Sequence, residues 1–257
     1  MRVWVVLPAY NEAENIPIIL RQLKSLADET YNLDLQVVIV DDASSDDTAE
    51  IASKPTWELP IMVIRNEVNL GLAGTFMRGV AEAAGQAGEG DIIVCMDADN
   101  THAPGQIERM VRNIREGRDV VIASRYRPGA VVRGVPLSRR FLSRGMSVLF
   151  RLIYPIKGVR DYSCGYRAYR AELVRSTLAS SGDQLFAKDG FACMVGILLR
   201  LAREGAICGE VPIVLRYDQK GGASKMRVGR TIFRTLAVLA RERFMGLRAG
   251  NHCQQGG

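Results

Sequence analysis

Three apolar segments of this sequence each end in a polar loop, and a helical pattern follows every loop. The segments are residues 3–7, 35–40 and 92–96. Short apolar runs without alternation are typical of strands that are buried on both faces of a parallel sheet. Because strands that alternate with helices build βαβ units, the sequence predicts an α/β fold with a mostly parallel central sheet flanked by helices.

Two aspartates, Asp97 and Asp99, follow the third apolar segment. They lie where a strand leaves the sheet, which is where open α/β folds bind ligands. Neighbouring carboxylates repel each other unless positive charge lies close, and Mg²⁺ takes one or two carboxylates together with substrate phosphates. The pair therefore indicates a metal site, with solvated loop acids as the alternative.

Asp41 and Asp42 follow the second apolar segment in the same way. Ser45 or Asp46 could cap a helix that starts near Thr48, because short polar side chains accept hydrogen bonds from the first N–H groups of a helix. Helix capping is therefore one interpretation of Asp41 and Asp42. Two adjacent acids before the cap favour contact with a ligand.

The composition disfavours several classes of protein. The chain has 257 residues, 47% of them hydrophobic, so it can form one large α/β domain or two small ones. Its five cysteines include no C-x-x-C pair, which disfavours zinc and a disulfide framework and fits a reducing compartment. Two histidines leave little for a Ser-His-Asp hydrolase. There is no P-loop or G-x-G-x-x-G motif, and no secretory leader is predicted before residue 3.

Charge is divided unevenly along the chain. Residues 1–102 hold 6 basic and 17 acidic side chains, for a net charge of −11, whereas residues 103–257 hold 28 and 11, for +17. An acidic half that could hold a cation thus precedes a basic half that could hold phosphates, with solvated arginine-rich helix faces as the alternative. No aromatic stacking platform is visible, so nucleic acid is not an expected partner.

Four motifs in the first half of the chain occur in order: PAYNE at 8–12, DDASSDDT at 41–48, NLGLAG at 69–74 and DADNTH at 97–102. With them the chain resembles the nucleotide-sugar-dependent glycosyltransferases of family 2, which have a GT-A fold, over residues 3–228. Five further motifs are similar to dolichol-phosphate or polyprenyl-phosphate mannose synthases. They are SRY at 124–126, PLSRRFLSRG at 136–145, DYSCGY at 161–166, EVPI at 210–213 and GASK at 222–225.

The resemblance implies a role for particular residues on the donor side. The nucleoside would contact Pro8, Tyr10 and Glu12, and its base or ribose would contact Asp41 or Asp42. The diphosphate would lie at Asp97, Ala98 and Asp99, with Mg²⁺ or Mn²⁺ on Asp99, and Arg216 and Lys225 would reach it from a mobile loop. Related synthases place a glutamine metal ligand where this chain has Thr101, so Thr101 could bind the metal through its hydroxyl or through water, or His102 could replace it.

On the acceptor side, the resemblance implies that Arg125, Arg139 and Ser143 hold the phosphate of a polyprenyl lipid. A phosphate monoester has a second pKa of about 6, so it is largely ionised near neutral pH and needs arginines to aim it rather than a general base. Its direct attack on the anomeric carbon would invert the configuration.

The predicted function is therefore an inverting transfer of a hexose to polyprenyl or dolichyl phosphate. Mannose from GDP-mannose is the first expectation and glucose from UDP-glucose the second. A family 2 transferase that acts on a saccharide hydroxyl, with a base at Asp161 or Asp189, stays open. A nucleotidyltransferase and a non-catalytic scaffold are further alternatives.

A lipid acceptor requires a membrane, yet no apolar run approaches the ~20 residues of a spanning helix. Residues 146–156 and 231–240 look amphipathic and are flanked by arginines, as in helices that lie in the membrane interface, and core packing is the alternative. We expect a GT-A catalytic domain over residues 1–228, then a basic amphipathic helix and a disordered tail over 229–257. The protein would be peripheral at the cytoplasmic face of a membrane, or held there by a membrane-anchoring partner protein.

Overall fold

The structure is a computed structural model that describes residues 1–31, 33–181 and 192–219. Its strands are β1 (Arg2–Ala9), β2 (Asp34–Asp41), β3 (Ile61–Arg65), β4 (Ile92–Cys95), β5 (Val120–Ser124), β6 (Val131–Arg133), β7 (Arg167–Arg170), β8 (Cys208–Pro212) and β9 (Val214–Arg216). Its α-helices are α1 (Ile16–Glu29), α2 (Thr48–Ala52), α3 (Gly71–Gln86), α4 (Gln106–Arg115), α5 (Leu137–Ile153), α6 (Ala171–Ser181) and α7 (Ala192–Arg203). Short 3₁₀ helices, η1 (Pro55–Trp57) and η3 (Tyr217–Gln219), complete the described elements.

Seven strands form one sheet in the order β3-β2-β1-β4-β7-β5-β8, and β6 and β9 pair in a second, two-stranded sheet. The three strands predicted from apolar runs are confirmed as β1, β2 and β4, and β1 pairs in parallel with both others. On its other side β4 pairs with β7 in the antiparallel direction. β7 is also antiparallel to β5, so the sheet is mixed but mostly parallel.

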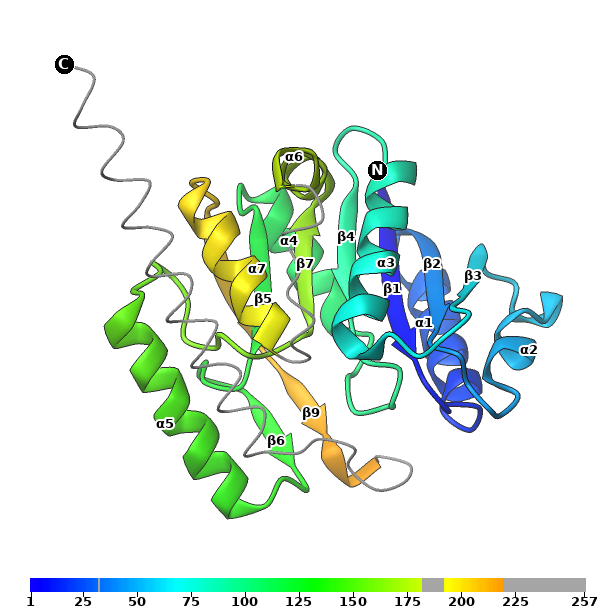
Figure 1. Cartoon of the computed structure of the whole chain (residues 1–257), viewed down its shortest axis with the longest axis horizontal. Helices are drawn as coiled ribbons and strands as arrows, with labels where there is room; N and C mark the ends of the chain where they lie inside the picture. Colours follow the sequence, from blue (N-terminus) through cyan, green and yellow to red (C-terminus); the bar gives the residue numbers. More distant parts are fainter. Residues whose placement is uncertain (32, 182–191, 220–257) are drawn as a thin grey trace.

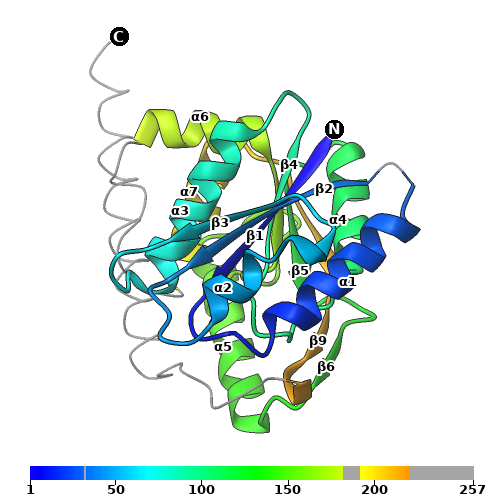
Figure 2. The same cartoon turned by 90° about the vertical axis from the view of Figure 1, so that its right-hand side faces the viewer.

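Helices cover both faces of the main sheet. Figures 1 and 2 show α3, α6 and α7 on one face, with α1 and α4 on the other. Gly79 lets α3 lie close to the sheet, since a Cβ at this position would come within 2.5 Å of Val6 and 2.9 Å of Val40. The β4 residues are completely buried, as expected for a strand covered on both faces.

The second sheet and α5 lie beyond the carboxyl ends of the main strands, at the lower left of Figure 1. α5 joins two parts of the sequence that were interpreted separately, the arginine-rich motif at 136–145 and the amphipathic segment at 146–156. It ends at Ile153, so the predicted interfacial segment is only partly helical. Phe150 is buried whereas Leu152 is exposed, so the segment combines core packing with an exposed apolar face.

Among the described residues, no helix combines the length and the apolar character that a membrane span requires. The predicted domain boundary at residue 228 and the segments 229–257 and 231–240 lie outside the described residues.

Candidate active site

The loops that follow β1 and β2 are tied together at the carboxyl edge of the sheet. The backbone N–H of Asn11 donates to Oγ of Ser44 (2.9 Å), and that of Glu12 donates to Oγ1 of Thr48 (2.8 Å). Asp47, rather than the predicted Ser45 or Asp46, is the N-cap residue of α2, and it makes no side-chain cap hydrogen bond. Oδ1 of Asp46 accepts the N–H of Thr48, the first residue of the helix (3.1 Å). These contacts fix the two loops relative to each other.

The loops after β1, β2 and β4 each contain a non-glycine residue with positive φ. Asn11, Ala43 and Asn100 follow β1, β2 and β4 with φ of 52°, 56° and 58°. Such conformations cost of order 1–3 kcal/mol each and persist where the surroundings impose them, often at functional sites. The carboxyl edge of the sheet therefore contains strained backbone where the sequence predicts ligand binding.

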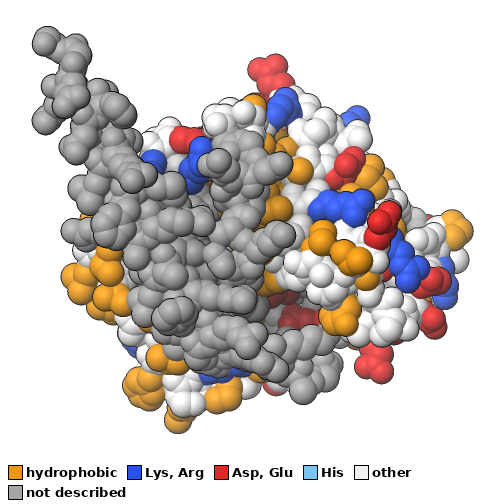
Figure 3. Space-filling view, viewed as in Figure 1, with side chains coloured by type: hydrophobic (Ala, Val, Ile, Leu, Met, Phe, Trp, Pro, Cys, Tyr) orange, Lys and Arg blue, Asp and Glu red, His pale blue; other side chains and the backbone are white. Residues whose placement is uncertain are grey.

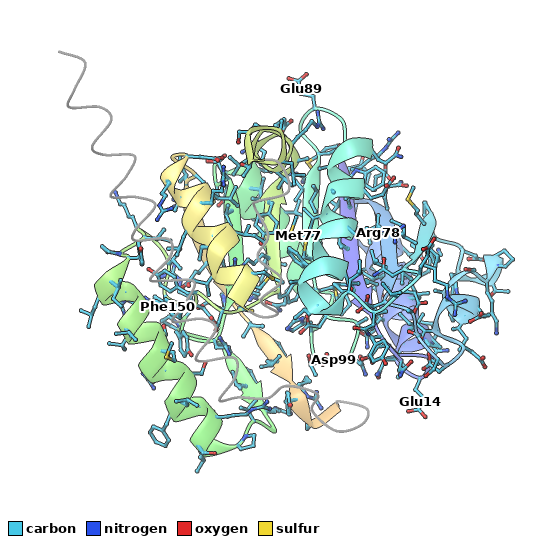
Figure 4. The ribbon with its side chains drawn as sticks, in the orientation of Figure 1. Glu14, Met77, Arg78, Glu89, Asp99 and Phe150 are labelled. Carbon is cyan, nitrogen blue, oxygen red and sulfur yellow. The ribbon has the colours of Figure 1, made fainter. Side chains whose placement is uncertain are left out.

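Asp97 and Asp99 lie in the loop after β4, at the lower edge of the molecule in Figure 4, where Asp99 is labelled. The Asp97 side chain is 35% exposed and Asp99 is half-buried, so neither points into the packed interior. Ala98 between them is buried. The two carboxylates are thus presented at the ligand-binding edge of the fold, as predicted.

Thr101 orients the carboxylate of Asp99 by two hydrogen bonds. Its Oγ1 donates to Oδ1 of Asp99 (2.6 Å), and its backbone N–H donates to the same oxygen (3.2 Å). Thr101 is buried, with 3% of its surface exposed. In this arrangement the threonine hydroxyl orients Asp99, and metal binding by Thr101, through its hydroxyl or through water, stays a prediction.

His102 contacts the backbone of Asp97 and the ring of Tyr166. Its Nδ1 accepts the backbone N–H of Asp97 (3.1 Å), and its ring stacks on Tyr166 with centroids 4.9 Å apart. A neutral imidazole that accepts at Nδ1 carries its proton on Nε2 and offers no second lone pair. This geometry argues against His102 as the replacement metal ligand.

Arg216 lies beside the same loop through its backbone. Its N–H donates to the carbonyl of Thr101 (2.9 Å), and its neighbour Leu215 forms a β-bridge with His102. The Arg216 guanidinium, however, is hydrogen-bonded to both carboxylate oxygens of Asp218. Lys225, the other predicted donor-side cation, lies outside the described residues.

Asp41 and Asp42 are both buried and bound within the protein. Asp42 accepts the backbone N–H groups of Leu70 (2.8 Å) and Gly71 (2.9 Å), so it caps the start of α3. Oδ2 of Asp41 lies 3.3 Å from Nε of Arg65. The capping interpretation therefore holds for Asp42, on α3 rather than α2, and contact of either acid with a base or ribose stays a prediction.

The remaining predicted nucleoside residues line the outer side of the first loop. Tyr10 is 38% exposed, whereas Pro8, at the end of β1, and Glu12 are half-buried. Oε2 of Glu12 accepts the side-chain amide of Asn15 (2.7 Å), which places the carboxylate over the start of α1. Pro8 thus lies at the end of β1, with Tyr10 and Glu12 in the loop that follows it, and the binding role of all three stays a prediction.

Arg125, directly after β5, forms a buried ion pair with Asp161. Its Nε and Nη2 donate to the two carboxylate oxygens at 2.8 and 2.7 Å, and Nη2 also donates to Oγ of Ser163 (2.7 Å). Burial alone would raise the pKa of Asp161, but the charge and hydrogen bonds of Arg125 outweigh it and hold that pKa below its ordinary value. Asp161 is therefore an anion that orients Arg125.

Two residues that sequence reasoning missed hold this pair in place. Glu210 accepts the backbone N–H groups of Arg160 (2.6 Å) and Asp161 (2.7 Å), and burial raises its pKa. The fully buried Arg167 donates to three backbone carbonyls, those of Tyr162, Cys164 and Met194. Only Glu210 had a signal in the sequence, as the first residue of the EVPI motif, because the partners of Arg167 are backbone atoms of distant segments.

The other predicted acceptor residues lie one turn apart on α5. Ser143 shares a hydrogen bond with the hydroxyl of Tyr126 (2.7 Å), and Arg139 donates to the hydroxyl of Tyr217 (2.7 Å). Tyr126 follows Arg125 in the chain, and the Arg125 guanidinium lies 5.5 Å from the centre of its ring. One face of α5 is thereby joined to the ends of β5 and β9.

The acidic loop and this basic cluster are adjacent. A Cβ on Gly165 would lie 3.8 Å from Oδ1 of Asp97, so the segment that carries Asp161 and Ser163 also approaches the first carboxylate. The backbone N–H of Arg216, at the end of β9 and next to Tyr217, donates to the carbonyl of Thr101. The segment that holds Arg125 thus approaches the first of the two part-exposed carboxylates at the carboxyl edge of the sheet.

This donor set fits a divalent cation that is shared with a phosphate ligand. Hard cations take carboxylate oxygens, and Mg²⁺ usually needs only one or two of them beside substrate phosphates. Among the residues that the structure describes, no group of three or more His, Cys, Asp or Glu side chains could enclose a metal alone. The carboxylates of Asp97 and Asp99 therefore suit a metal that arrives with its substrate.

The sequence matches the family model described as "Glycosyl transferase family 2" over residues 4–178. It is 33% identical to a dolichol-phosphate mannosyltransferase of Pyrococcus furiosus over 94% of this chain and 63% of that protein, so it spans less than two thirds of the length of that relative. It is 34% identical to an undecaprenyl-phosphate mannosyltransferase of Micrococcus luteus over 97% of this chain and 98% of that protein.

Solved structures share the fold at lower identity. A mannosyl-3-phosphoglycerate synthase from Rubrobacter xylanophilus superimposes with a TM-score of 0.67 at 20% identity over 100% of this chain and 77% of that chain. A glucosyl-3-phosphoglycerate synthase from Mycobacterium tuberculosis, solved with Mn²⁺, uridine diphosphate and glucosyl-3-phosphoglycerate, gives 0.65 at 20% identity over 93% and 78%. The chain therefore belongs to glycosyl transferase family 2, and it is a glycosyltransferase with a GT-A fold.

Proposed function

We propose that this glycosyltransferase moves a hexose, first of all mannose from GDP-mannose, to the phosphate of a polyprenyl lipid with inversion of configuration. The observation that supports the proposal is the approach of the segment that holds Arg125 to Asp97, at the Cβ position of Gly165. Ser143 and Arg139 of α5 are hydrogen-bonded to Tyr126 and Tyr217, at the ends of β5 and β9. The names of the two mannosyltransferase relatives support the same acceptor class.

On the donor side, Asp97 and Asp99 would hold a Mg²⁺ or Mn²⁺ ion against the nucleotide diphosphate. The ion, when bound, stabilises the negative charge that develops on the departing diphosphate. Thr101 keeps the Asp99 carboxylate in one orientation through its 2.6 Å hydrogen bond. Arg216 would add positive charge there only after its guanidinium leaves Asp218.

On the acceptor side, Arg125 and Arg139 would bind two faces of one phosphate, and Ser143 would donate a hydrogen bond. The guanidinium fork matches phosphate oxygens in pairs, and a phosphate that is already ionised can attack without a base. As its oxygen bonds to the anomeric carbon, the bond from that carbon to the diphosphate breaks on the opposite side. The sugar is then transferred with inversion.

The contacts of Asp161 favour a phosphate acceptor over a saccharide hydroxyl. A hydroxyl acceptor needs a general base within hydrogen-bond reach. Both oxygens of Asp161 instead accept hydrogen bonds from Arg125, and Oδ1 also accepts the N–H of Cys164, with the carboxylate completely buried. Asp189, the other candidate base, lies outside the described residues.

A direct test incubates the protein with radiolabelled GDP-mannose, UDP-glucose and other sugar nucleotides, with Mn²⁺ or Mg²⁺ and a short polyprenyl phosphate in detergent. Label that moves into organic solvent measures transfer, and label that dissociates in mild acid identifies a sugar phosphate ester. We expect transfer from GDP-mannose that is lost with a chelator and in Asp99→Ala. Transfer to a free saccharide but not to lipid phosphate would overturn the proposal.

Arg139→Ala separates the acceptor role from general damage. We expect KM for the lipid phosphate to rise, with donor binding unchanged. Arg140→Ala is the matched control, because Arg140 is the next residue on α5 but is exposed, and its side chain has no hydrogen bond among the described residues. An equal loss of donor and acceptor use in Arg139→Ala would contradict its assignment.

The exposed face of α5 supports a peripheral membrane contact. Leu137, Phe141, Val148 and Leu152 are 67%, 74%, 49% and 77% exposed, and their spacing of four, seven and four residues puts them on one side of the helix. Figure 3 shows hydrophobic side chains at the left and lower left, where α5 lies in Figure 1. Exposed apolar patches mark interaction surfaces, and arginines beside such a face suit an anionic lipid surface.

We name these four residues the apolar face of α5. Phe141→Ser should lower cosedimentation with vesicles and leave transfer to a short lipid phosphate in detergent unchanged. Tyr31→Ser is the matched control, because Tyr31 is 90% exposed and follows α1, at the other end of the molecule. Vesicle binding that does not respond to Phe141→Ser would exclude the apolar face of α5 as the contact.

A further inference from the structure

A groove of about 630 Å³ lies at the C-terminal end of α5, and its lining does not include Arg125, Arg139 or Ser143. Its lining combines four cations with apolar side chains and, among the described residues, contains no acid. The cations, which we name the groove cations, are Arg127, Arg151, Lys157 and Arg160. The apolar part includes Val148 and Leu152, so the groove is continuous with the apolar face of α5.

The groove cations are available to a ligand. Arg151, Lys157 and Arg160 are exposed, and within the described residues their side chains make no hydrogen bond or ion pair. Nε of Arg127 lies 3.9 Å from the buried Glu210, and the Arg127 side chain is 40% exposed. Arg151, Lys157 and Arg160 thus have no acidic partner within the described residues, and like charges repel one another, so an anion that enters the groove is stabilised there.

The walls of the groove are fixed by buried contacts. The hydroxyl of Tyr162 donates to the carbonyl of Tyr154 (2.7 Å) and accepts the N–H of Ile156 (3.1 Å), and its ring stacks on Phe150 at 5.4 Å. Ser147 of α5 donates to the carbonyl of Arg160. The loop that carries Lys157 is therefore held against α5 before any ligand binds.

Glycine is required where this loop crosses the sheet. Gly158 has φ of +86°, and a Cβ there would come within 2.6 Å of the carbonyl oxygen of Cys208. Gly158 itself lines the groove between Lys157 and Arg160. The arrangement is built by the fold rather than by a chance collection of long surface side chains.

We propose that this groove binds the phosphate headgroup of an anionic membrane phospholipid, a lipid distinct from the acceptor. Guanidinium and ammonium groups match a phosphate, and the shared residues Val148 and Leu152 place the groove at the level where the apolar face of α5 would meet the bilayer. The proposal rests on the membrane contact proposed above. It adds a second anionic lipid, which would hold the enzyme in a fixed orientation next to its acceptor.

The test compares full-length protein and variants on vesicles of phosphatidylcholine alone and with part of it replaced by phosphatidylglycerol, at constant ionic strength. A basic residue near an anionic surface contributes roughly a fivefold change in partitioning, so Arg151→Gln with Lys157→Gln should bind phosphatidylglycerol vesicles about 25-fold more weakly. Binding to phosphatidylcholine alone should not change. The charge-keeping pair Arg151→Lys with Lys157→Arg should bind like wild type.

The matched control is Arg21→Gln with Lys54→Gln, which removes the same amount of positive charge. Arg21 lies on α1 and Lys54 is the second residue after α2, at the opposite end of the molecule from α5. An equal loss in both double variants would assign the effect to net charge and overturn the groove. Competition by inorganic phosphate would assign it to a free anion, and a change of oligomeric state without a change in vesicle binding would assign it to a second copy. Either result refutes the proposal.

The groove can fail or succeed independently of the proposed reaction. Transfer to a short polyprenyl phosphate in detergent should be equal in wild type and in Arg151→Gln with Lys157→Gln. If wild type transfers no sugar to lipid phosphate, the proposed function fails while the vesicle comparison still reports on the groove. If that double variant loses transfer in detergent, the groove belongs to the acceptor site and the proposal of a second lipid is wrong.

Discussion

Replacement of Asp161 by asparagine tests whether the Arg125–Asp161 pair is the structural centre of the site. Asp161 is completely buried, and its two oxygens accept hydrogen bonds from Nε and Nη2 of Arg125 and from the backbone N–H groups of Arg125 and Cys164. Asparagine keeps the shape but removes the charge, and its NH₂ group meets a donor instead of an acceptor. Removal of one partner from a buried pair costs about 3–5 kcal/mol.

Because the Arg125 side chain is still 24% exposed, we expect the lower end of that range, about 3 kcal/mol. For a chain of this length that corresponds to a fall in Tm of about 6–12 °C. The control is Asp28→Asn, which makes the same chemical change in an i,i+4 pair with Lys24 where the aspartate is 58% exposed. That change should shift Tm far less, because an exposed ion pair is screened by solvent.

Urea unfolding and thermal unfolding of Asp161→Asn, Arg125→Gln and the double variant measure the coupling. The two single changes should be far from additive, since either one breaks the same pair. Asp161 has a lowered pKa in the folded state, so its contribution is present above the ordinary aspartate pKa of about 3.9 and is lost as pH falls through the lower folded value. Additive costs within about 0.5 kcal/mol would refute the reasoning.

Three further changes test separate parts of the structure. Burial raises the pKa of Glu210 above 4.5, so the folded protein keeps that proton to higher pH than the unfolded protein does, and stability is lost as pH rises through this window. Glu210→Gln should lack that loss when urea unfolding is measured as a function of pH. A pH dependence in Glu210→Gln that runs parallel to that of wild type would contradict this expectation. Thr101→Val should weaken Mn²⁺ binding in the presence of nucleotide diphosphate about 10-fold or more by calorimetry, with Thr101→Ser close to wild type, and equal affinity in all three would remove its orienting role. Gly158→Ala should cost about 2 kcal/mol or more in urea unfolding because of its positive φ and the carbonyl of Cys208, and a neutral effect would show that the loop can shift.

The parts of the fold that sequence predicted are those with local signals. The β1, β2 and β4 segments are continuous apolar runs, and the polar residues that follow them must lie at one edge of a parallel sheet. The positions of Asp97 and Asp99 follow from that rule alone. The antiparallel β7 was not predicted, because RAYR is short, begins and ends with arginine, and has no apolar period.

The parts of the site that sequence could not predict depend on contacts between distant segments. Asp161 lies 36 residues after Arg125, and no local pattern in the sequence indicates that its carboxylate is hydrogen-bonded to an arginine rather than accessible to a substrate. α5 was divided into two segments because the motif at 136–145 is rich in arginine whereas residues 146–156 are mostly apolar. Thr101 shows the same limit, because its hydroxyl could bind a metal or a neighbouring carboxylate until the rotamer of Asp99 is known.

The Arg125–Asp161 pair gives more to specificity than to stability. A buried ion pair is weak support for a fold, because desolvation offsets most of its attraction. It does fix a long side chain in advance: Nε and Nη2 are held by Asp161 and Ser163, whereas Nη1 has no hydrogen bond among the described residues. An anion that binds there need not pay the roughly 0.5–1.5 kcal/mol of ordering a free arginine. A lysine at residue 125 has only one side-chain nitrogen, which could pair with Asp161 or face the acceptor. It could not be held by Asp161 through one edge of a guanidinium and bind a phosphate through the other edge, as arginine can.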